Sequence, residues 1–240
     1  MVIKVCLNGG RTKREHAGIP VTLDEVIADI HVVRKLGVQH FHVHLRDSEG
    51  METFENRLLA PQMRILRQRF PDIKIGLSSN LFNGMTPERR YRNIREWEFR
   101  PDYISVNLSE PGSVELWNLL KNKGIKPEAG IWSLNDAEIF VKHKLDLFCE
   151  RVLIEMFFEE EEEAIRQANQ ISDIIAEHNH SLEQVHHGEG INTWAVIDNA
   201  LSQDYGVRIG LEDTLVLRNG VRASGNVELY RELKMGQAAF

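Results

Sequence analysis

The sequence predicts a (β/α)8 barrel, in which eight parallel strands alternate with eight helices. Short apolar runs and amphipathic segments alternate along all 240 residues, at about 30 residues per strand–helix pair. Strands separated by helices pair in parallel through right-handed crossovers. Eight such units fit a closed barrel, and barrels of this size commonly form one domain. We therefore expect a single domain over residues 1–240, with a doubly wound open sheet as the alternative.

The expected strands are short apolar runs bounded by turn residues or polar loops. The first run ends in Asn8-Gly9-Gly10, which favours a turn directly after the strand. In chain order the expected strands cover residues 2–7, 38–45, 73–77, 103–106, 126–132, 151–156, 184–187 and 207–211.

Capping residues indicate where several of the helices begin. Residues 22–25, Thr-Leu-Asp-Glu, form a capping box ahead of a helix that runs to residue 35. Thr86 precedes Pro87, and proline favours the first position of a helix. Ser133 or Asn135 caps a helix that runs to residue 144. The remaining helices are expected at residues 62–69, just after a proline, and at 114–123, 161–178, 194–204 and 226–234.

Composition and charge exclude several classes of function. The chain has 29 Lys and Arg against 36 Asp and Glu, a net charge of −7, which argues against a nucleic-acid partner. No apolar run is long enough to span a bilayer, and residues 1–10 lack the pattern of a signal peptide. The two cysteines, Cys6 and Cys149, do not make a disulfide framework, and neither is assigned a nucleophilic role. We expect a cytoplasmic enzyme of small metabolites with no membrane partner.

The densest chemical signal is His40-Phe41-His42-Val43-His44 on the second expected strand, followed by Arg46 and Asp47. Alternate residues of a strand share a face, so the three histidines point the same way. The last of them reach the mouth of a barrel, where catalysis occurs. Two neutral imidazoles can hold one Zn²⁺ and leave positions for a third ligand and a substrate oxygen. We predict that His42 and His44 bind a metal and that His40 is structural; a hydrogen-bonded pair of interior histidines is the alternative.

A second polar cluster stands at the end of the eighth expected strand. Arg208 lies within this strand, and Glu212 and Asp213 follow it. In a closed barrel only the first strand separates the eighth from the second, so Glu212 can complete a His₂Glu metal site. Asp213 is expected to support the ligands or to pair with Arg208. An exposed acidic turn is the alternative.

Polar and glycine residues after other strands are candidates for substrate binding. Glycines 9 and 10 let backbone N–H groups approach an anion, and Arg11 can clamp a carboxylate or phosphate. An ordinary turn explains this segment equally well. The predicted substrate-binding residues are Asn8, Gly9, Gly10, Arg11, Arg46, Ser78, Ser79 and Asn107, with Asn80, Ser105 and Glu128 as weaker candidates.

The segment His186-His187-Gly188-Glu189-Gly190 closes the seventh expected strand. We interpret it as a flexible loop, and a mobile lid or a second metal contact are the alternatives. The roles of His186, His187 and Glu189 are left open at this point.

Four segments together resemble the β-keto acid cleavage enzymes. They are residues 7–12, Leu-Asn-Gly-Gly-Arg-Thr; residues 19–22, Ile-Pro-Val-Thr; residues 42–47, His-Val-His-Leu-Arg-Asp; and residues 207–213, Val-Arg-Ile-Gly-Leu-Glu-Asp. The resemblance runs in the same order over nearly the whole chain, and Ser224-Gly225-Asn226 before the last helix is also similar. It implies a zinc-bearing (β/α)8 barrel that exchanges acyl groups between a β-keto acid and acetyl-CoA, giving acetoacetate and a new acyl-CoA.

The resemblance also assigns roles to particular residues. It implies one zinc ion per chain on His42, His44 and Glu212, with Arg208 and Asp213 as the pair that moves a proton. A serine that binds substrate would be Ser78 or Ser79. The cofactor is zinc, the co-substrate is acetyl-CoA, and the chain is expected to form a homo-oligomer, for example a tetramer. Residues 128–132 depart from the aromatic–acidic sequence typical of the family.

Two other functions remain open from the sequence. An amidohydrolase-like hydrolase also carries His-x-His in a barrel, but typically on the first strand and with further histidines on later strands. A non-catalytic barrel that binds a ligand or serves in an assembly would contain no stoichiometric metal.

Overall fold

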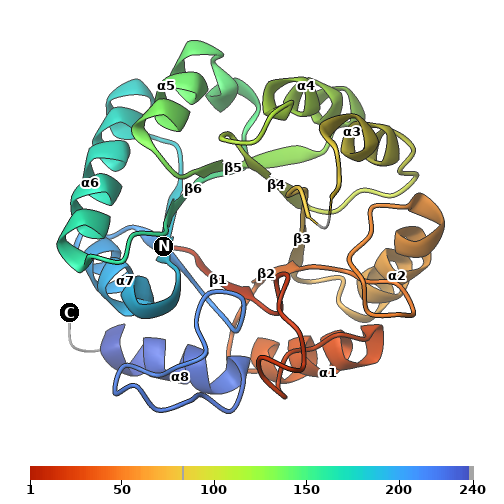
Figure 1. Cartoon of the computed structure of the whole chain (residues 1–240), viewed down its shortest axis with the longest axis horizontal. Helices are drawn as coiled ribbons and strands as arrows, with labels where there is room; N and C mark the ends of the chain where they lie inside the picture. Colours follow the sequence, from red (N-terminus) through yellow and green to blue (C-terminus); the bar gives the residue numbers. More distant parts are fainter. Residues whose placement is uncertain (83, 238–240) are drawn as a thin grey trace.

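The computed structural model, which describes residues 1–82 and 84–237, is a closed barrel of eight parallel strands in the order β1 to β8. Figure 1 looks down this barrel, with the strands as an inner ring, the helices around them, and the chain running once around the axis. The (β/α)8 barrel is confirmed. The doubly wound sheet is excluded, because β1 pairs in parallel with both β2 and β8 and the sheet therefore has no open edge.

Each strand is short and is followed by a helix on the outside of the barrel. The strands are β1 (Ile3–Cys6), β2 (His40–Val43), β3 (Lys74–Ser78), β4 (Tyr103–Asn107), β5 (Lys126–Ile131), β6 (Arg151–Met156), β7 (Gln184–Gly188) and β8 (Gly206–Ile209). The helices are α1 (Leu23–Arg34), α2 (Asn56–Arg69), α3 (Pro87–Arg95), α4 (Ser113–Lys123), α5 (Leu134–Lys142), α6 (Glu161–His178), α7 (Thr193–Ser202) and α8 (Asn226–Gln237). One-turn 3-10 helices lie at Leu145–Phe148 and Gly190–Asn192.

The helix caps expected from the sequence are present. The Thr22 hydroxyl accepts the backbone N–H of Glu25, whose carboxylate accepts the backbone N–H of Thr22, so the capping box is complete. Thr86 caps α3 with proline at the first helical position. Of the two candidates for the cap of α5, Ser133 is the one that accepts a backbone N–H.

Helix α2 begins earlier than the sequence indicated. We expected it just after Pro61, but it starts at Asn56 and contains this proline. An interior proline costs about 3 kcal/mol or more because it lacks an N–H and crowds the preceding turn. Leu59, Met63 and Leu66 are buried on one face of α2. Burial of such side chains stabilises a fold by about 1.5–3 kcal/mol each, which offsets the proline.

The strand expected over residues 184–187 is present as β7, so the interpretation of residues 186–190 as a flexible loop is wrong for the two histidines. Both lie in β7 and are buried, since this strand pairs with β6 along its whole length. The ring of His186 stacks on Tyr205 with centroids 4.7 Å apart. Burial lowers the pKa of His186 to about 3, so this histidine is a neutral part of the core. Glu189 is half-exposed and precedes the short turn before α7.

The amino-terminal part of the barrel interior holds a buried charge network. Lys4 on β1 donates to Glu128 on β5 at 2.5 Å, and Arg151 on β6 donates to the same carboxylate at 3.2 Å. Both cations lie over the Tyr103 ring. Burial would raise the pKa of Glu128, but Lys4 and Arg151 lower it to about 2. His40 accepts from Arg151, in agreement with its expected structural role, and Glu128 is fully buried in this network.

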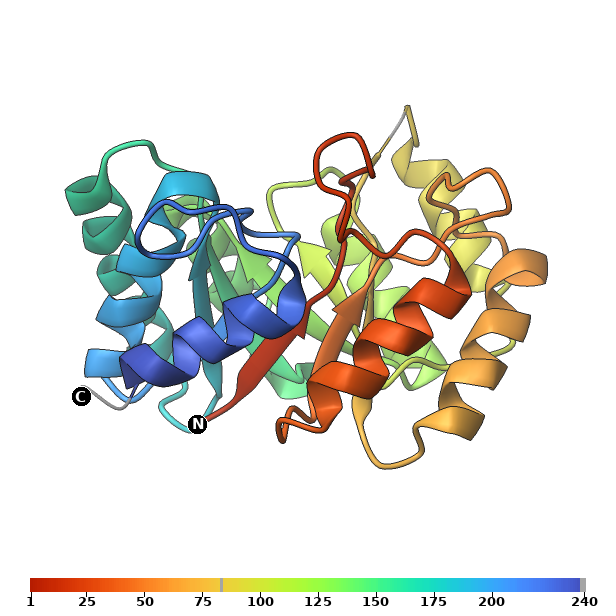
Figure 2. The ribbon, with the colours of Figure 1, turned by 90° about the horizontal axis from the view of Figure 1, so that it is seen from below.

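The carboxyl ends of the strands meet at one edge of the barrel. Figure 2 shows the red loop after β1 and the blue loop after β8 rising on this same edge. The residues predicted to bind metal and substrate follow these strands and therefore gather there. Among the described residues, no helix is both long enough and apolar enough to cross a membrane.

Removing one member of the buried network tests its contribution to stability. We expect Lys4→Met to lower the free energy of unfolding by about 3 kcal/mol, because it leaves a buried carboxylate with one cation fewer. Urea denaturation followed by circular dichroism measures this. Arg166→Met, in an exposed ion pair with Glu163, is the control and should leave the free energy of unfolding nearly unchanged. Equal effects of the two substitutions would contradict the account.

Candidate active site

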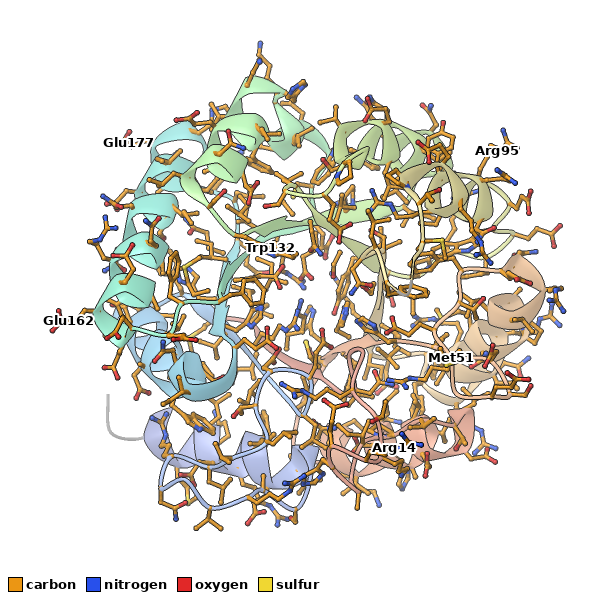
Figure 3. The ribbon with its side chains drawn as sticks, in the orientation of Figure 1. Arg14, Met51, Arg95, Trp132, Glu162 and Glu177 are labelled. Atoms are coloured by element: carbon orange, nitrogen blue, oxygen red, sulfur yellow. The ribbon has the colours of Figure 1, made fainter. Side chains whose placement is uncertain are left out.

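A cavity of about 400 Å³ opens at the carboxyl edge of the barrel. Figure 3 shows Trp132 directed toward the barrel axis, whereas Arg95, Glu162 and Glu177 lie at the periphery. Nine of the predicted site residues line the cavity: Gly10, Arg11, His42, His44, Ser78, Asn107, Arg208, Glu212 and Asp213. The other four, Asn8, Gly9, Arg46 and Ser79, are not among the residues that line it.

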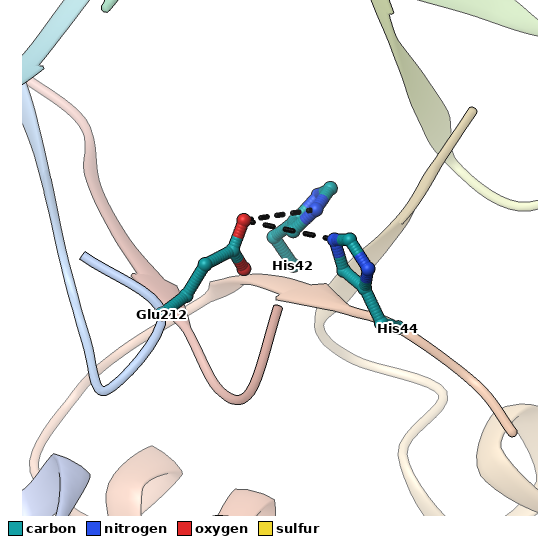
Figure 4. Close-up of side chains that lie close together, drawn as sticks. All are labelled: His42, His44 and Glu212. Atoms are coloured by element: carbon teal, nitrogen blue, oxygen red, sulfur yellow. Dashed lines mark ion pairs between the residues drawn. The ribbon is translucent and has the colours of Figure 1, made fainter. Parts of the chain in front are cut away.

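The three predicted metal ligands lie together at one side of this cavity. His42 and His44 stand at the end of β2, and Glu212 stands in the turn after β8 (Figure 4). The Nε2 atoms of His42 and His44 lie 3.8 and 3.6 Å from Oε1 of Glu212. One donor atom from each of the three lies within 4.8 Å of the others. Two imidazoles and one carboxylate with a fourth position open form a donor set that suits a catalytic zinc ion.

The glycine-rich turn after β1 makes room for Glu212. Gly9 has φ +51°, and a Cβ at this position would lie 2.5 Å from Cγ of Glu212. Gly210 packs as closely against β1, because a Cβ there would lie 1.9 Å from the Cys6 carbonyl oxygen. These glycines let the turns after β1 and β8 approach each other, which carries Glu212 over the strand that separates it from the histidines.

The side chains of Asn8 and Arg46 form hydrogen bonds with backbone groups and do not line the cavity. The Asn8 side chain accepts the N–H of His44 at 2.9 Å and donates to the carbonyl of His44 at 3.0 Å. Arg46 donates to the carbonyls of Gly9 and Arg11 at 2.8 and 2.6 Å. In this structure Asn8 therefore fixes the backbone of His44, and Arg46 fixes the loop after β1.

Each histidine is oriented by a second hydrogen bond. Nδ1 of His44 lies 2.6 Å from a carboxylate oxygen of Glu52, and Nδ1 of His42 lies 3.4 Å from the Ser105 hydroxyl. Such partners fix the ring and leave Nε2 directed to the metal position. The sequence analysis did not find Glu52, because an acid eight residues after a histidine follows no strand or helix periodicity.

Burial and neighbouring charges shift the pKa values of all three candidate ligands. Burial lowers the pKa of His42 well below its ordinary value, so this imidazole is neutral. Burial also lowers the pKa of His44, but the carboxylates of Glu212 and Glu52 outweigh it and raise this pKa to about 9. Burial would raise the pKa of Glu212, yet Arg208 and the two histidines hold it well below its usual range. Oε2 of Glu212 is buried and has no hydrogen-bond partner among the described residues, which leaves this oxygen available to an ion.

Arg208 forms the expected pair with Asp213. Its Nε donates to Oδ1 of Asp213 at 2.9 Å, and its Nη2 donates to Oε1 of Glu212 at 2.6 Å. Oδ2 of Asp213 is buried and without a hydrogen-bond partner in residues 1–82 and 84–237. The arginine thus fixes one oxygen of Asp213 and leaves the other free to accept a proton.

The structure adds Glu155 and His187 to the site. Nε2 of His187 donates to Oε2 of Glu155 at 3.0 Å, and Nδ1 of His187 lies 3.5 Å from Asp213. Glu155 escaped the sequence analysis because it lies inside the apolar strand β6. A single acid within such a run was the signal that could have found it, since buried acids are rare without a partner.

The two serines after β3 differ in position. Ser78 lines the cavity and its hydroxyl donates to Asn80, whereas the hydroxyl of buried Ser79 donates to the Ser105 carbonyl at 2.6 Å. Of the two candidates left open by the sequence, Ser78 is the one within reach of a ligand.

A family model described as beta-keto acid cleavage enzyme matches residues 1–235. The chain belongs to this family. A 3-keto-5-aminohexanoate cleavage enzyme of Fusobacterium nucleatum subsp. nucleatum is 22% identical to it over 246 residues, which cover 95% of this chain and 88% of the relative. An enzyme of the same description from Acetoanaerobium sticklandii is 20% identical over 250 residues, which cover 97% of this chain and 90% of the relative.

Solved structures agree with the fold. ObcA in a binary complex with oxaloacetate superposes with a TM-score of 0.73 at 15% identity, over 92% of this chain and 64% of that chain. ObcA has also been solved in a ternary complex with a C4-CoA adduct and oxalate. This member of the β-keto acid cleavage enzyme family thus spans less than two thirds of the length of ObcA, and the likeness shows a shared barrel.

The Glu52 carboxylate, which contacts Nδ1 of His44, offers a test of the candidate metal site. We expect Glu52→Gln to weaken zinc binding by about 10- to 100-fold, because the imidazole loses the group that orients it. Competition with a chromogenic chelator measures the dissociation constant. Glu49→Gln, at an exposed position of the same loop, is the matched control. Unchanged zinc affinity in Glu52→Gln would show that the hydrogen bond does not support the site.

Proposed function

We propose that this protein is a zinc-dependent enzyme that transfers an acyl group from a β-keto acid to coenzyme A. In the proposed reaction R-CO-CH2-COO⁻ and acetyl-CoA give R-CO-S-CoA and acetoacetate. The observation that carries the proposal is the placement of one His₂Glu donor set beside a buried Arg–Asp pair in a single cavity. The family to which the chain belongs is named for cleavage of β-keto acids, which supports this chemistry.

His42, His44 and Glu212 would hold the metal. The unpaired Oε2 of Glu212 and the neutral imidazole of His42 make the site suitable for a divalent cation. Bound there, zinc would supply Lewis acidity at the keto oxygen of the substrate.

Asp213 is the proposed base. Its Oδ2 accepts a proton from the carbon next to a carbonyl, and its Oδ1 stays fixed on Arg208. Arg208 keeps a positive charge beside the base, because Asp213 and Glu212 raise the pKa of its guanidinium against the effect of burial. The developing negative charge on the substrate therefore forms next to a buried cation.

Polar groups around the cavity would hold the substrate carboxylate or the thioester arm. Ser78, Asn80 and the backbone of Gly10 line the cavity, and Arg11 is partly exposed at its mouth. Fixing the reacting carbons beside Asp213 in this way lowers the entropic cost of the reaction. The use of coenzyme A is supported by ObcA, which has been solved with a C4-CoA adduct.

The alternative of an amidohydrolase-like hydrolase has less support. The His-x-His pair stands on β2, and the one further histidine that lines the cavity among the described residues, His187, donates to Glu155. A homo-oligomeric state and a cytoplasmic location, both expected from the sequence, stay predictions.

Replacing the proposed base separates catalysis from metal binding. We expect Asp213→Asn to lower kcat for acetoacetate formation by about 10²- to 10⁴-fold and to keep the zinc content of the wild type, because it removes the proton acceptor but no ligand. Chromatography of the acyl-CoA product measures the rate across a panel of β-keto acids.

The control for this variant is Asp173→Asn on the exposed face of α6, which should retain wild-type turnover. Full activity of Asp213→Asn would contradict the proposed role of Asp213 as the base.

A further inference from the structure

We propose that Asn226, the first residue of α8, is a positioning residue that holds the turn carrying Glu212 in place beside the histidine pair on β2. Asp29 on α1 is the partner that orients the Asn226 amide. The inference rests on the metal site of the proposed function and adds to it two residues that do not line the cavity.

The Asn226 side chain is buried, and its oxygen and its nitrogen are both hydrogen-bonded. Its Oδ1 accepts the backbone N–H of Leu211 at 2.7 Å. Its Nδ2 donates to the carbonyl of Leu7 at 3.0 Å and to Oδ2 of Asp29 at 2.6 Å. A buried amide whose two N–H groups meet acceptors and whose oxygen meets a donor has one preferred orientation.

These bonds connect the two sides of the candidate metal site through β1. Leu7 follows β1 directly, and its N–H donates to the carbonyl of His42 at 3.0 Å. The Leu7 carbonyl accepts from Asn226. Oδ1 of Asn226 in turn holds the N–H of Leu211, the residue before Glu212. A path of hydrogen bonds therefore runs from the backbone of one proposed ligand to the neighbour of another.

Other contacts hold the turn after β8 independently of Asn226. The N–H of Glu212 donates to the carbonyl of Cys6 at 3.4 Å, and Nε of Arg11 donates to the carbonyl of Glu212 at 3.0 Å. The bond from Leu211 to Asn226 is shorter than both, at 2.7 Å, and ties the turn to α8. We therefore expect loss of the Asn226 amide to displace Glu212 while the turn stays attached to β1 and to the loop after β1.

Asp29 selects the orientation of the amide. Helices α1 and α8 are neighbours on the outside of the barrel (Figure 1), and Asp29 lies where α1 meets the start of α8. Burial raises the pKa of Asp29 to about 6, and the hydrogen bond from Asn226 opposes this rise. An ionised carboxylate only accepts hydrogen bonds, so it favours the orientation in which Nδ2 points to α1 and Oδ1 points to Leu211.

The test exchanges amide and carboxylate groups and measures the dissociation constant for zinc by competition with a chromogenic chelator, above the pKa of Asp29. We expect Asn226→Asp to weaken zinc binding by about 10- to 100-fold, because an acceptor then faces the Leu7 carbonyl and the Asp29 carboxylate. Asp29→Asn should leave the affinity within about threefold of the wild type, since its amide oxygen still accepts from Asn226.

The double variant tests the pairing itself. Adding Asp29→Asn to Asn226→Asp should tighten zinc binding by at least about threefold relative to Asn226→Asp alone, because one amide and one carboxylate face each other again. A role of the two residues in general stability alone predicts no such recovery of zinc affinity.

Gln184→Glu is the matched control for a change that only destabilises the fold. Gln184 is a buried amide at the start of β7 that donates to the Ser172 carbonyl and accepts from the Ser172 hydroxyl, and it does not line the cavity. The exchange of a buried amide for a carboxylate is the same, so Gln184→Glu should also lower the free energy of unfolding in urea. Its zinc affinity should stay within about threefold of the wild type.

Two outcomes would overturn the positioning role. One is wild-type zinc affinity in Asn226→Asp, and the other is an equal loss of affinity in Gln184→Glu. A double variant that binds zinc no more tightly than Asn226→Asp would overturn the pairing with Asp29. A carboxylate suits a helix N-terminus, so Asn226→Asp is expected to fold. If it does not, Asn226→Ser decides the question in the same way, because its shorter side chain removes the link to Leu211 without adding a charge.

Zinc affinity keeps this inference distinct from the proposed reaction. If the variants behave as expected and the wild type cleaves no β-keto acid, the reaction fails and the positioning role stands. If the wild type cleaves β-keto acids and Asn226→Asp binds zinc as tightly as the wild type does, the positioning role fails and the reaction stands. A wild type that binds no zinc contradicts both.

Discussion

Closure of the barrel through β1 is the constraint on which the site depends. His42 and His44 lie about 170 residues from Glu212 in the sequence, yet β1 pairs with the strands that carry both ends. Gly9 and Gly210 then let the turns on either side of β1 approach each other without a steric clash. The three candidate ligands therefore meet only in the closed fold, and the two glycines allow the close backbone contact that brings them together.

Several polar side chains that line the cavity are oriented by hydrogen bonds to neighbouring side chains. Glu52 and Ser105 orient the histidines, Arg208 fixes Glu212 and Asp213, and His187 fixes Glu155. Among the described residues that line the cavity, the buried carboxylate oxygens without hydrogen-bond partners belong to Glu155, Glu212 and Asp213. The unpaired oxygens of Glu212 and Asp213 are the groups to which the metal and the proton are assigned in the proposed function.

The sequence predicted the barrel and the proximity of His42, His44 and Glu212, because both follow from strand periodicity and strand order. Alternation along β2 placed His42 and His44 on one face, and strand counting placed Glu212 beside them. Contacts between distant segments had no such signal. Glu52 and Glu155 were therefore missed, and Asn8 and Arg46 were assigned to substrate although they hold backbone. The strand expected over residues 184–187 is present as β7, but nothing in the sequence indicated that His186 and His187 are both buried in it.

Elemental analysis tests the central claim most directly. The protein would be purified without chelator and without a histidine tag, beside a His44→Ala, Glu212→Gln double variant. The account predicts about one zinc ion per chain in the wild type and none in the double variant, since the variant loses two of the three ligands. The absence of metal from the wild type, or an equal content in both proteins, would contradict it.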